Sequence, residues 1–177
     1  TSVTIYLPAV QYYNFTSFEP VEGKGENITL DNVPFTDIPV HILGGSIVPL
    51  RSQSGNTTRA NREQNFTVLI APDAAGSAQG YLRLDDGISL ESSTESDIFM
   101  TFSNGTLIFD GTFGFEGATA IDKMVFLGQS EARNLTVGDG TRIPSTFDNA
   151  TSTIRAEGLN VPLIAPFSVA LSDAQMQ

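Results

Sequence analysis

Residues 38–50 read Ile38-Pro-Val-His-Ile-Leu-Gly-Gly-Ser-Ile-Val-Pro-Leu50, and the rest of the chain is organised around this stretch. Two apolar runs, residues 40–43 and 47–50, are separated by a diglycine. β-Branched residues around a diglycine predict two short strands joined by a tight turn or a bulge, because glycine reaches positive φ without steric cost. The prolines at positions 39 and 49 mark places where a ladder donor is not needed. Nothing in this pattern is catalytic, so we interpret it as a packing element.

Short apolar or alternating segments recur along the whole chain at spacings of about 8 to 15 residues. Further strands are expected at residues 3–7, 12–15, 28–30, 66–71, 80–84, 98–102, 106–109, 123–127, 135–137, 152–156 and 167–171. Ser103-Asn104-Gly105 is the best hairpin signal in the chain. No stretch combines helical periodicity with caps, so the fold class is predicted to be all-β, with antiparallel β-sandwiches.

The predicted organisation is two antiparallel β-sandwich domains. Residues 1–52 are expected to form part of the first sandwich, residues 53–61 a linker, and residues 62–177 the second sandwich. Residues 1–7 already alternate like a strand, so we expect the first sandwich to be incomplete and to be completed by an upstream chain. The polar segment 51–64 between them is predicted to be a loop or linker.

The composition excludes several classes of function. The formal net charge of −11 argues against nucleic acid and anionic membranes as partners. The chain has no cysteine, which excludes zinc fingers, thiol catalysis and disulfide frameworks. No apolar run approaches the roughly 18 residues that a membrane span needs. Twelve phenylalanines and no tryptophan supply the aromatic residues of the expected core, together with four tyrosines.

Sequons for N-linked glycosylation are unusually dense. Seven of the ten asparagines stand two residues before a threonine with no proline between, whereas chance would give about two. They are Asn14, Asn27, Asn56, Asn65, Asn104, Asn134 and Asn149. We therefore expect N-linked glycans on the surface and a secreted, extracellular protein.

Three groups of residues are candidates for chemistry. His41 is the only histidine and lies in an apolar strand, where a structural role is favoured. Asp85-Asp86 could be an acid/base pair or a calcium site, but neighbours on a strand face opposite ways and aspartates before a glycine usually form turns. Arg51, Arg59 and Arg62 could mark a ligand site, although a solvated linker is favoured. The residues alone predict no catalytic, cofactor or metal site.

Three blocks together resemble the C-terminal region of glycoside hydrolase family 31, the α-glucosidase family. Val3-Thr-Ile-Tyr-Leu-Pro8 with Tyr12-Tyr-Asn-Phe15 looks like that family's VYLP…WYDF strand pair. Residues 38–50 look like its IPVFVRGGSIIPL element, and Phe66-Thr-Val-Leu-Ile-Ala71 with Gly80-Tyr-Leu-Arg-Leu-Asp-Asp-Gly87 looks like its LLVAL…LYLDDG hairpin. The match covers roughly residues 1–90. Tyr12, Asn14 and Leu43 depart from the family's usual Trp, Asp and Arg.

The resemblance implies that this chain is a non-catalytic fragment or subunit of a secreted, fungal-type α-glucosidase. In this family a (β/α)8 barrel precedes a proximal and a distal β-sandwich, and the two catalytic aspartates lie in barrel loops. No position here matches their motifs, so no catalytic residue is transferred. The implied partner is the barrel chain of the same enzyme, held noncovalently, and an α-glucoside substrate would be met only in the assembled enzyme. The implied reaction is hydrolysis with retention.

Two alternatives stay open at this stage. One is a stand-alone carbohydrate-binding or adhesion module, for which Tyr12, Tyr13 and Tyr81 are the candidate binding residues, although core or interface roles are favoured for them. The other is a family 31 enzyme of different specificity, such as an α-xylosidase or the processing glucosidase of the endoplasmic reticulum. Fold analogy does not fix specificity.

Overall fold

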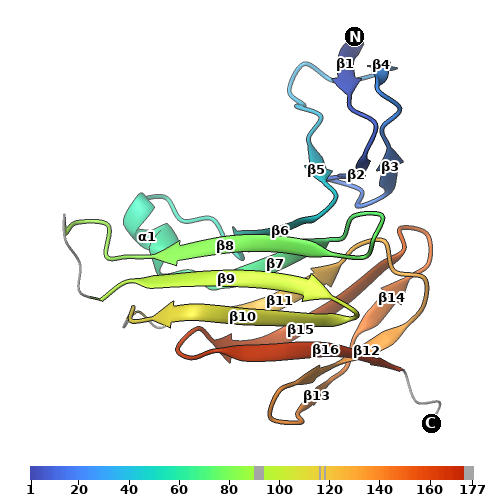
Figure 1. Ribbon diagram of the computed structural model, residues 1–177. Coiled ribbons are helices and arrows are strands. Elements are labelled where there is room, and N and C mark those ends of the chain that lie inside the picture. The colour runs from blue at the N-terminus through green and yellow to red at the C-terminus, as the bar shows by residue number, and fades with distance from the viewer. Residues whose placement is uncertain (90–93, 116, 118, 174–177) are drawn as a thin grey trace.

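The protein is seen in a computed structural model that describes residues 1–89, 94–115, 117 and 119–173. It has two parts (Figure 1). Residues 1–43 form an arm that stands away from a larger β-sandwich built by the rest of the chain. The predicted all-β class is confirmed: the described residues form sixteen strands and one short helix.

The arm contains two small antiparallel sheets. Its strands are β1 (Val3–Leu7), β2 (Gln11–Asn14), β3 (Pro20–Glu22), β4 (Glu26–Leu30) and β5 (His41–Leu43). Among the described strands, β1 pairs with β4 alone, over five residues, while β2 lies between β3 and β5. The strand β3 and its pairing with β2 were not expected from the sequence.

The sandwich is one continuous sheet of eleven described strands that folds back on itself in two layers (Figure 1). Its strands are β6 (Ser46–Arg51), β7 (Phe66–Ala71), β8 (Ala78–Leu84), β9 (Ser96–Ser103), β10 (Thr106–Phe113), β11 (Ala120–Phe126), β12 (Arg133–Val137), β13 (Arg142–Ile143), β14 (Thr146–Asp148), β15 (Thr153–Pro162) and β16 (Phe167–Asp173). Their order in the sheet is β13-β12-β16-β10-β9-β8-β6-β7-β11-β15-β14. Most neighbours are antiparallel, but β11 runs parallel to β7, and β6 is bridged to β8 in parallel at one residue pair.

Alternation along the strands builds the core of the sandwich. In β9, Ser96, Ile98, Met100 and Phe102 are buried while the residues between them are not. Because strand side chains alternate in direction, this pattern turns one face inward. The two layers meet where Phe102 of β9 packs at 5.5 Å, centroid to centroid, against a ring of β11. The core is thus a two-layer aromatic and aliphatic interior.

The predicted hairpin forms between β9 and β10. Ser103 pairs with Thr106, so the loop has two residues. Asn104 and Gly105 have φ of 49° and 73°. Two successive positive φ values are the signature of the type I′ turn, whose twist matches that of the flanking strands.

The diglycine is the point where the chain passes from the arm into the sandwich. Strand β5 pairs with β2 in the arm, whereas β6 pairs with β7 over six residues in the sandwich. Gly44 donates to the carbonyl of Gln11 at 2.8 Å, and Gly45 donates to the carbonyl of Ala71 at 2.7 Å. Gly45 has φ of 92°, and a Cβ on Gly44 would come within 2.8 Å of the Gln11 oxygen. Only glycine fits such a crossing.

The sheet order places part of the first predicted domain in the large sheet. The division into domains 1–52 and 62–177 stays a prediction, as does completion of the first by an upstream chain. Residues 46–51, which we grouped with the first domain, nevertheless lie inside the large sheet, because they hydrogen-bond along β7. The expected linker 53–61 includes most of a short helix, α1 (Thr58–Arg62). No helix among the described residues has both the length and the apolar character needed to cross a bilayer.

Candidate functional site

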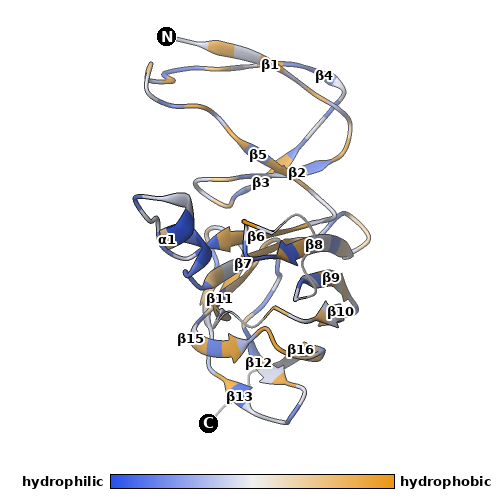
Figure 2. Cartoon of the chain, turned by 90° about the vertical axis from the view of Figure 1, so that its left-hand side faces the viewer, coloured by the Kyte–Doolittle hydropathy of each residue, from blue (hydrophilic) through white to orange (hydrophobic). Residues whose placement is uncertain are grey.

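The arm carries most of the exposed large apolar side chains among the described residues. Among the described residues, thirteen large apolar side chains are exposed, and eight of them lie between positions 3 and 43. These eight are Val3, Tyr6, Val10, Phe15, Phe35, Ile38, Val40 and Leu43. Phe35 is fully exposed and Ile38 is 85% exposed. Figure 2 shows hydrophobic segments along the arm, in β1 and around β2 and β5.

The thinness of the arm explains this exposure. A two-stranded ribbon such as β1–β4 has no second layer, and such ribbons are marginally stable in water by themselves. In β1, Leu7 is the one buried residue, and β4 has none. The outer edges of both arm sheets also carry unpaired backbone groups in the described structure, which are templates for further pairing. Exposed apolar residues gathered in one region mark an interaction surface.

A small second core attaches the arm to the sandwich. Tyr13 and Ile42 of the arm pack with Leu69 and Ala71 of β7 and with residues of the segment 125–127. The Tyr13 hydroxyl donates to the carbonyl of Pro72 at 2.9 Å. Burial, and secondarily the nearby Asp73 carboxylate, raises the pKa of Tyr13 above its ordinary value. The strands β7 and β11 are therefore covered on both faces, by the sandwich core on one side and by the arm on the other.

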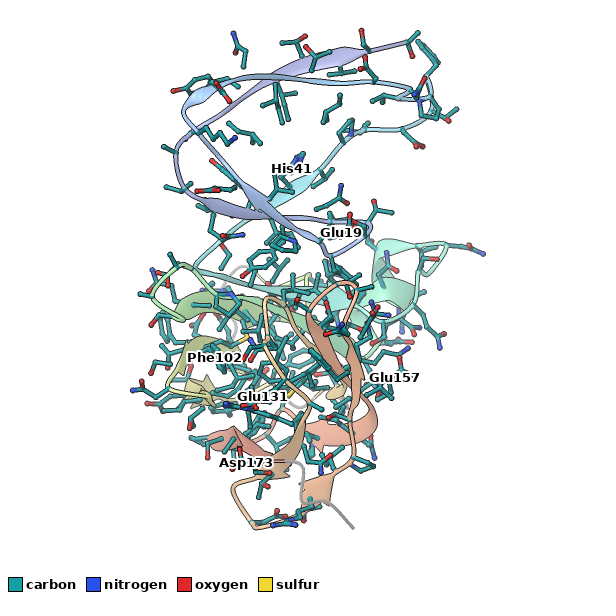
Figure 3. All side chains as sticks on the ribbon, turned by 90° about the vertical axis from the view of Figure 1, so that its right-hand side faces the viewer. Glu19, His41, Phe102, Glu131, Glu157 and Asp173 are labelled. Atoms are coloured by element: carbon teal, nitrogen blue, oxygen red, sulfur yellow. The ribbon has the colours of Figure 1, made fainter. Side chains whose placement is uncertain are left out.

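His41 lies in the arm, half-buried in β5. Its ring meets the ring of Tyr12 edge-on, with 6.5 Å between centroids. Figure 3 places His41 in the arm, whereas the carboxylates of Glu131, Glu157 and Asp173 lie in the sandwich. The structure therefore gives His41 a packing contact and does not bring it together with these carboxylates.

The three candidate sugar-binding tyrosines are not brought together. Tyr13 is buried at 4% exposure, so a ligand cannot reach its ring. Tyr12 is half-buried against His41. Tyr81 is exposed on β8, where its ring lies 5.2 Å from that of Phe99 and its hydroxyl donates to Asp97. Of the three, Tyr81 is the one that is classed as exposed, at 45%.

Asp86 closes the turn that follows β8. Its Oδ1 accepts from the backbone N–H groups of Ile88 and Ser89, each at 2.9 Å, and its Oδ2 accepts from the Ser89 hydroxyl at 2.5 Å. The hydroxyl of Ser89 first, and then the two backbone donors, lower the pKa of Asp86 to about 2. Such bonds stabilise the ionised form of a carboxylate. The local, turn-forming role expected for this residue type is what the structure shows.

A pH titration checks this turn. Because the pKa of Asp86 is lower in the folded chain than in the unfolded chain, its contribution to stability is complete above about pH 4 and is lost as pH falls toward 2. Replacing Ser89 with alanine should raise the pKa of Asp86 toward its ordinary value. The measurement is a carboxyl ¹³C NMR titration, with Ser103→Ala as the control. A midpoint for Asp86 near 4 in the unmodified protein would contradict the assignment.

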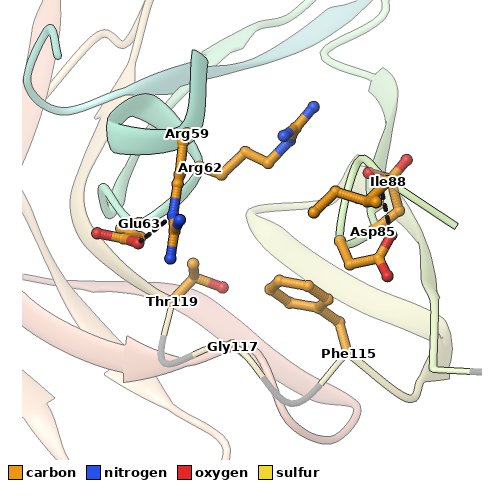
Figure 4. Close-up of a pocket in the computed structure, with 9 residues that line it drawn as sticks. Arg59, Arg62, Glu63, Asp85, Ile88, Phe115, Gly117 and Thr119 are labelled. Atoms are coloured by element: carbon orange, nitrogen blue, oxygen red, sulfur yellow. Dashed lines mark hydrogen bonds and ion pairs between the residues drawn. The ribbon is translucent and has the colours of Figure 1, made fainter. Parts of the chain in front are cut away.

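Two arginines of segment 51–64, Arg51 and Arg59, have different environments. Arg51 places its guanidinium 4.0 Å from the centre of the Phe66 ring and donates to the carbonyl of Gln64 at 2.6 Å. Burial, and then repulsion by Arg62, lowers the pKa of Arg51. Arg59 is exposed and pairs with Glu63 at 3.9 Å (Figure 4). The expected linker is thus partly ordered by α1, a helix that was not predicted from the sequence. Its one available signal was Thr57, whose hydroxyl caps the helix by accepting from the Ala60 N–H at 3.1 Å.

None of the seven sequon asparagines is buried. Asn27, Asn56, Asn104 and Asn149 are exposed, and Asn14, Asn65 and Asn134 are partly exposed. The side-chain amide of Asn65 is hydrogen-bonded at both ends: its Nδ2 donates to Asp122 at 2.9 Å, and its Oδ1 accepts from the Ala120 N–H at 3.0 Å. Glycosylation at all seven positions stays a prediction.

Comparison with known proteins settles the family. Residues 1–48 match the model of the glycosyl hydrolase family 31 C-terminal domain. Over 137 residues the chain is 46% identical to a "Probable alpha/beta-glucosidase" of Arthroderma benhamiae, which covers 76% of this chain and 16% of that relative. This chain belongs to the C-terminal region of glycosyl hydrolase family 31. The resemblance seen in the three sequence blocks is thereby confirmed.

A second relative is similar in sequence, and two solved structures are similar in fold. An alpha-glucosidase of Schizosaccharomyces pombe is 35% identical over 149 residues, which are 84% of this chain and 15% of that relative. The chain thus spans only a small part of the length of the curated relatives it matches. In fold, the crystal structure of a glucosidase II alpha subunit covers 97% of this chain, with a TM-score of 0.84 at 19% identity; the match takes up 21% of that structure's chain. A family 31 dextranase of Flavobacterium johnsoniae covers 97% of this chain with a TM-score of 0.72 at 17% identity, over 24% of its own chain.

Proposed function

We propose that this chain is the non-catalytic C-terminal part of a secreted α-glucosidase. The identity to fungal relatives named as alpha/beta-glucosidases carries this proposal. The assembled enzyme removes terminal α-linked glucose from maltose, malto-oligosaccharides and starch ends. It acts with retention through two carboxylates about 5 to 5.5 Å apart, which lie on an upstream segment.

In this proposal the arm is the part of the chain that braces the catalytic (β/α)8 segment. The eight exposed apolar side chains and the open sheet edges of the arm support this role, because both are costly in water unless another surface covers them. The contact is noncovalent, as a chain without cysteine requires. N-linked glycans on the seven sequons keep the outer surface soluble. Nucleic acid is not a partner of a chain with a net charge of −11.

Activity of the complete enzyme tests the first half of the proposal. Incubation with maltose should release glucose, and ¹H NMR of the first product should show the α anomer. Release of the β anomer would contradict retention. No hydrolysis of maltose or of malto-oligosaccharides would overturn the assigned activity.

Charged substitutions in the arm test the second half. In the complete enzyme, the double change Phe35→Asp and Ile38→Asp should lower the stability of the assembly by about 3 kcal/mol or more, because burying each side chain contributes about 1.5–3 kcal/mol. Half-inactivation temperature is the measurement. Ile164→Asp is the matched control, since Ile164 is 65% exposed on the sandwich. Equal temperatures for the two variants would show that the arm is not the docking surface.

A further inference from the structure

The two faces of the β1–β4 ribbon differ in character, and Figure 1 shows this ribbon at the end of the arm farthest from the sandwich. Side chains alternate between the faces along each strand, and direct cross-strand partners share a face. One face carries Glu26 and the apolar residues Val3, Ile5, Leu7, Ile28 and Leu30. The other, the polar face, carries the exposed residues Thr4, Tyr6, Asn27 and Thr29. The apolar face is therefore the one suited to a further protein layer.

Tyr6 is the one aromatic residue on the polar face. It is 61% exposed, and it shares the face with the hydrogen-bonded hydroxyls of Thr4 and Thr29, which are 3.1 Å apart. A Cβ on Gly25 would lie 3.8 Å from the Tyr6 hydroxyl oxygen. The ring thus reaches from β1 toward the residue that precedes β4, and its outward side is open to solvent.

Asn27 is the direct cross-strand partner of Tyr6. Direct partners in an antiparallel pair have Cβ atoms about 4.5–5.5 Å apart, so a group carried by one partner lies within reach of a ring carried by the other. Asn27 is exposed and begins the sequon Asn27-Ile28-Thr29. A glycan attached to Asn27 therefore starts beside the Tyr6 ring.

Asn27 differs in this respect from the other two sequon asparagines that have cross-strand partners in the described strands. Asn14 pairs with the half-buried His41, and its side-chain oxygen already accepts two backbone N–H groups of its own turn. Asn134 pairs with Ser172, which has no ring. Of the three, Asn27 alone has an exposed aromatic ring opposite it.

The first sugar of an N-linked glycan has a surface that complements an aromatic ring. Glycan transfer forms a bond from Nδ2 of Asn27 to the anomeric carbon of N-acetylglucosamine, breaks the anomeric C–O bond of a lipid diphosphate-linked donor, and releases one proton from Nδ2. The C–H bonds on one side of the sugar ring are apolar and weakly positive, whereas the face of an aromatic ring is negative. The sugar can therefore cover the open side of Tyr6 while its hydroxyls stay in water.

We propose that the N-linked glycan on Asn27 packs its first sugar against the ring of Tyr6 and thereby stabilises the β1–β4 ribbon. The presence of the glycan rests on the proposed function, in which the protein is secreted, whereas the contact rests on the pairing of the two strands. The polar face is then the outer side of the ribbon, and the apolar face is the side that packs against the upstream segment. Tyr6 is covered by sugar and takes no part in that docking.

The test is hydrogen exchange of the β1 and β4 amides in the complete enzyme, secreted from a host that attaches N-linked glycans. The unmodified protein is compared with Asn27→Gln, with Tyr6→Thr and with the double variant. Removing the glycan by Asn27→Gln should speed exchange about fivefold when Tyr6 is present, which is the size expected for one aromatic contact. In the Tyr6→Thr background the same change should have almost no effect. An endoglycosidase that leaves the first sugar on Asn27 should leave the protection in place.

Asn134→Gln is the matched control, because its glycan lies opposite Ser172. This variant should leave the exchange of the β12 and β16 amides unchanged. A similar acceleration there would show that any glycan protects its strand, and it would overturn the specific contact with Tyr6.

The outcomes separate this inference from the proposed function. An Asn27 peptide without glycan, in an enzyme that hydrolyses maltose, overturns the contact and leaves the α-glucosidase assignment standing. So does an equal effect of Asn27→Gln with and without Tyr6. Loss of assembly stability in Tyr6→Thr, whether or not the glycan is present, would show that Tyr6 docks on protein instead. Normal coupling between Tyr6 and the glycan in a protein that does not hydrolyse maltose would overturn the enzyme assignment alone.

Discussion

Replacing Phe126 with alanine is expected to destabilise the sandwich by about 3–5 kcal/mol. Phe126 is fully buried in β11, between Ile70 of β7 and Ile154 of β15, and its ring packs against Phe102 of the opposite layer. Removing the ring deletes buried apolar surface and leaves a cavity that a closely packed interior fills only in part. The site sits at the centre of the core, so the layers cannot close over the gap.

Urea denaturation followed by far-ultraviolet circular dichroism measures this loss. The matched control is Phe99→Ala, because Phe99 is 57% exposed on the outer face of β9 and its removal leaves no cavity. The control should cost less than about 1 kcal/mol. A loss of equal size for both variants would mean that the two layers do not share the core described here.

Replacing Tyr13 with alanine is expected to release the arm from the sandwich while leaving the sandwich folded. Tyr13 is the largest buried side chain that the arm contributes to the second core, and Gly128 leaves room for its ring, since a Cβ there would lie 2.5 Å from the Tyr13 oxygen. Truncating a buried aromatic ring costs about 3–5 kcal/mol. Here that cost falls on the junction, because the core of the sandwich includes no arm residue.

Hydrogen exchange resolves the two parts of this prediction. Amides of β2 and β5 should exchange faster in Tyr13→Ala, and amides of β9 and β10 should not change. Tyr13→Phe keeps the ring and removes only the bond to the Pro72 carbonyl, so it should cost about 1–2 kcal/mol. Uniform acceleration across arm and sandwich would show that they unfold as one unit.

Local signals in the sequence were enough for most of the strands. Residues 66–71 form β7 with the predicted bounds, because a largely apolar run of six residues, three of them β-branched, that ends at a proline has few alternatives. The turn at Asn104-Gly105 was equally readable, since few residue pairs tolerate two positive φ values. The turn role of the Asp85-Asp86 pair also followed from local chemistry, through Asp86.

Structural features that depend on residues far apart in the chain could not be predicted from the sequence. The diglycine predicts a change of direction, but not that β5 and β6 enter different sheets, which is decided by β2 and β7. The parallel pairing of β7 with β11 follows from the closure of the sandwich.

The double coverage of β7 and β11 has a consequence for engineering the protein. An insertion in a strand that packs against two cores would disturb both of them. The diglycine cannot absorb extra residues either, because Gly44 and Gly45 are each hydrogen-bonded to a different sheet. Insertions or fusions at this crossing should therefore be poorly tolerated. The tip at residues 74–76, a short exposed turn, is the better place to graft a peptide tag. The arm and the sandwich are thus joined through shared packing on β7 and β11, and not through a flexible linker.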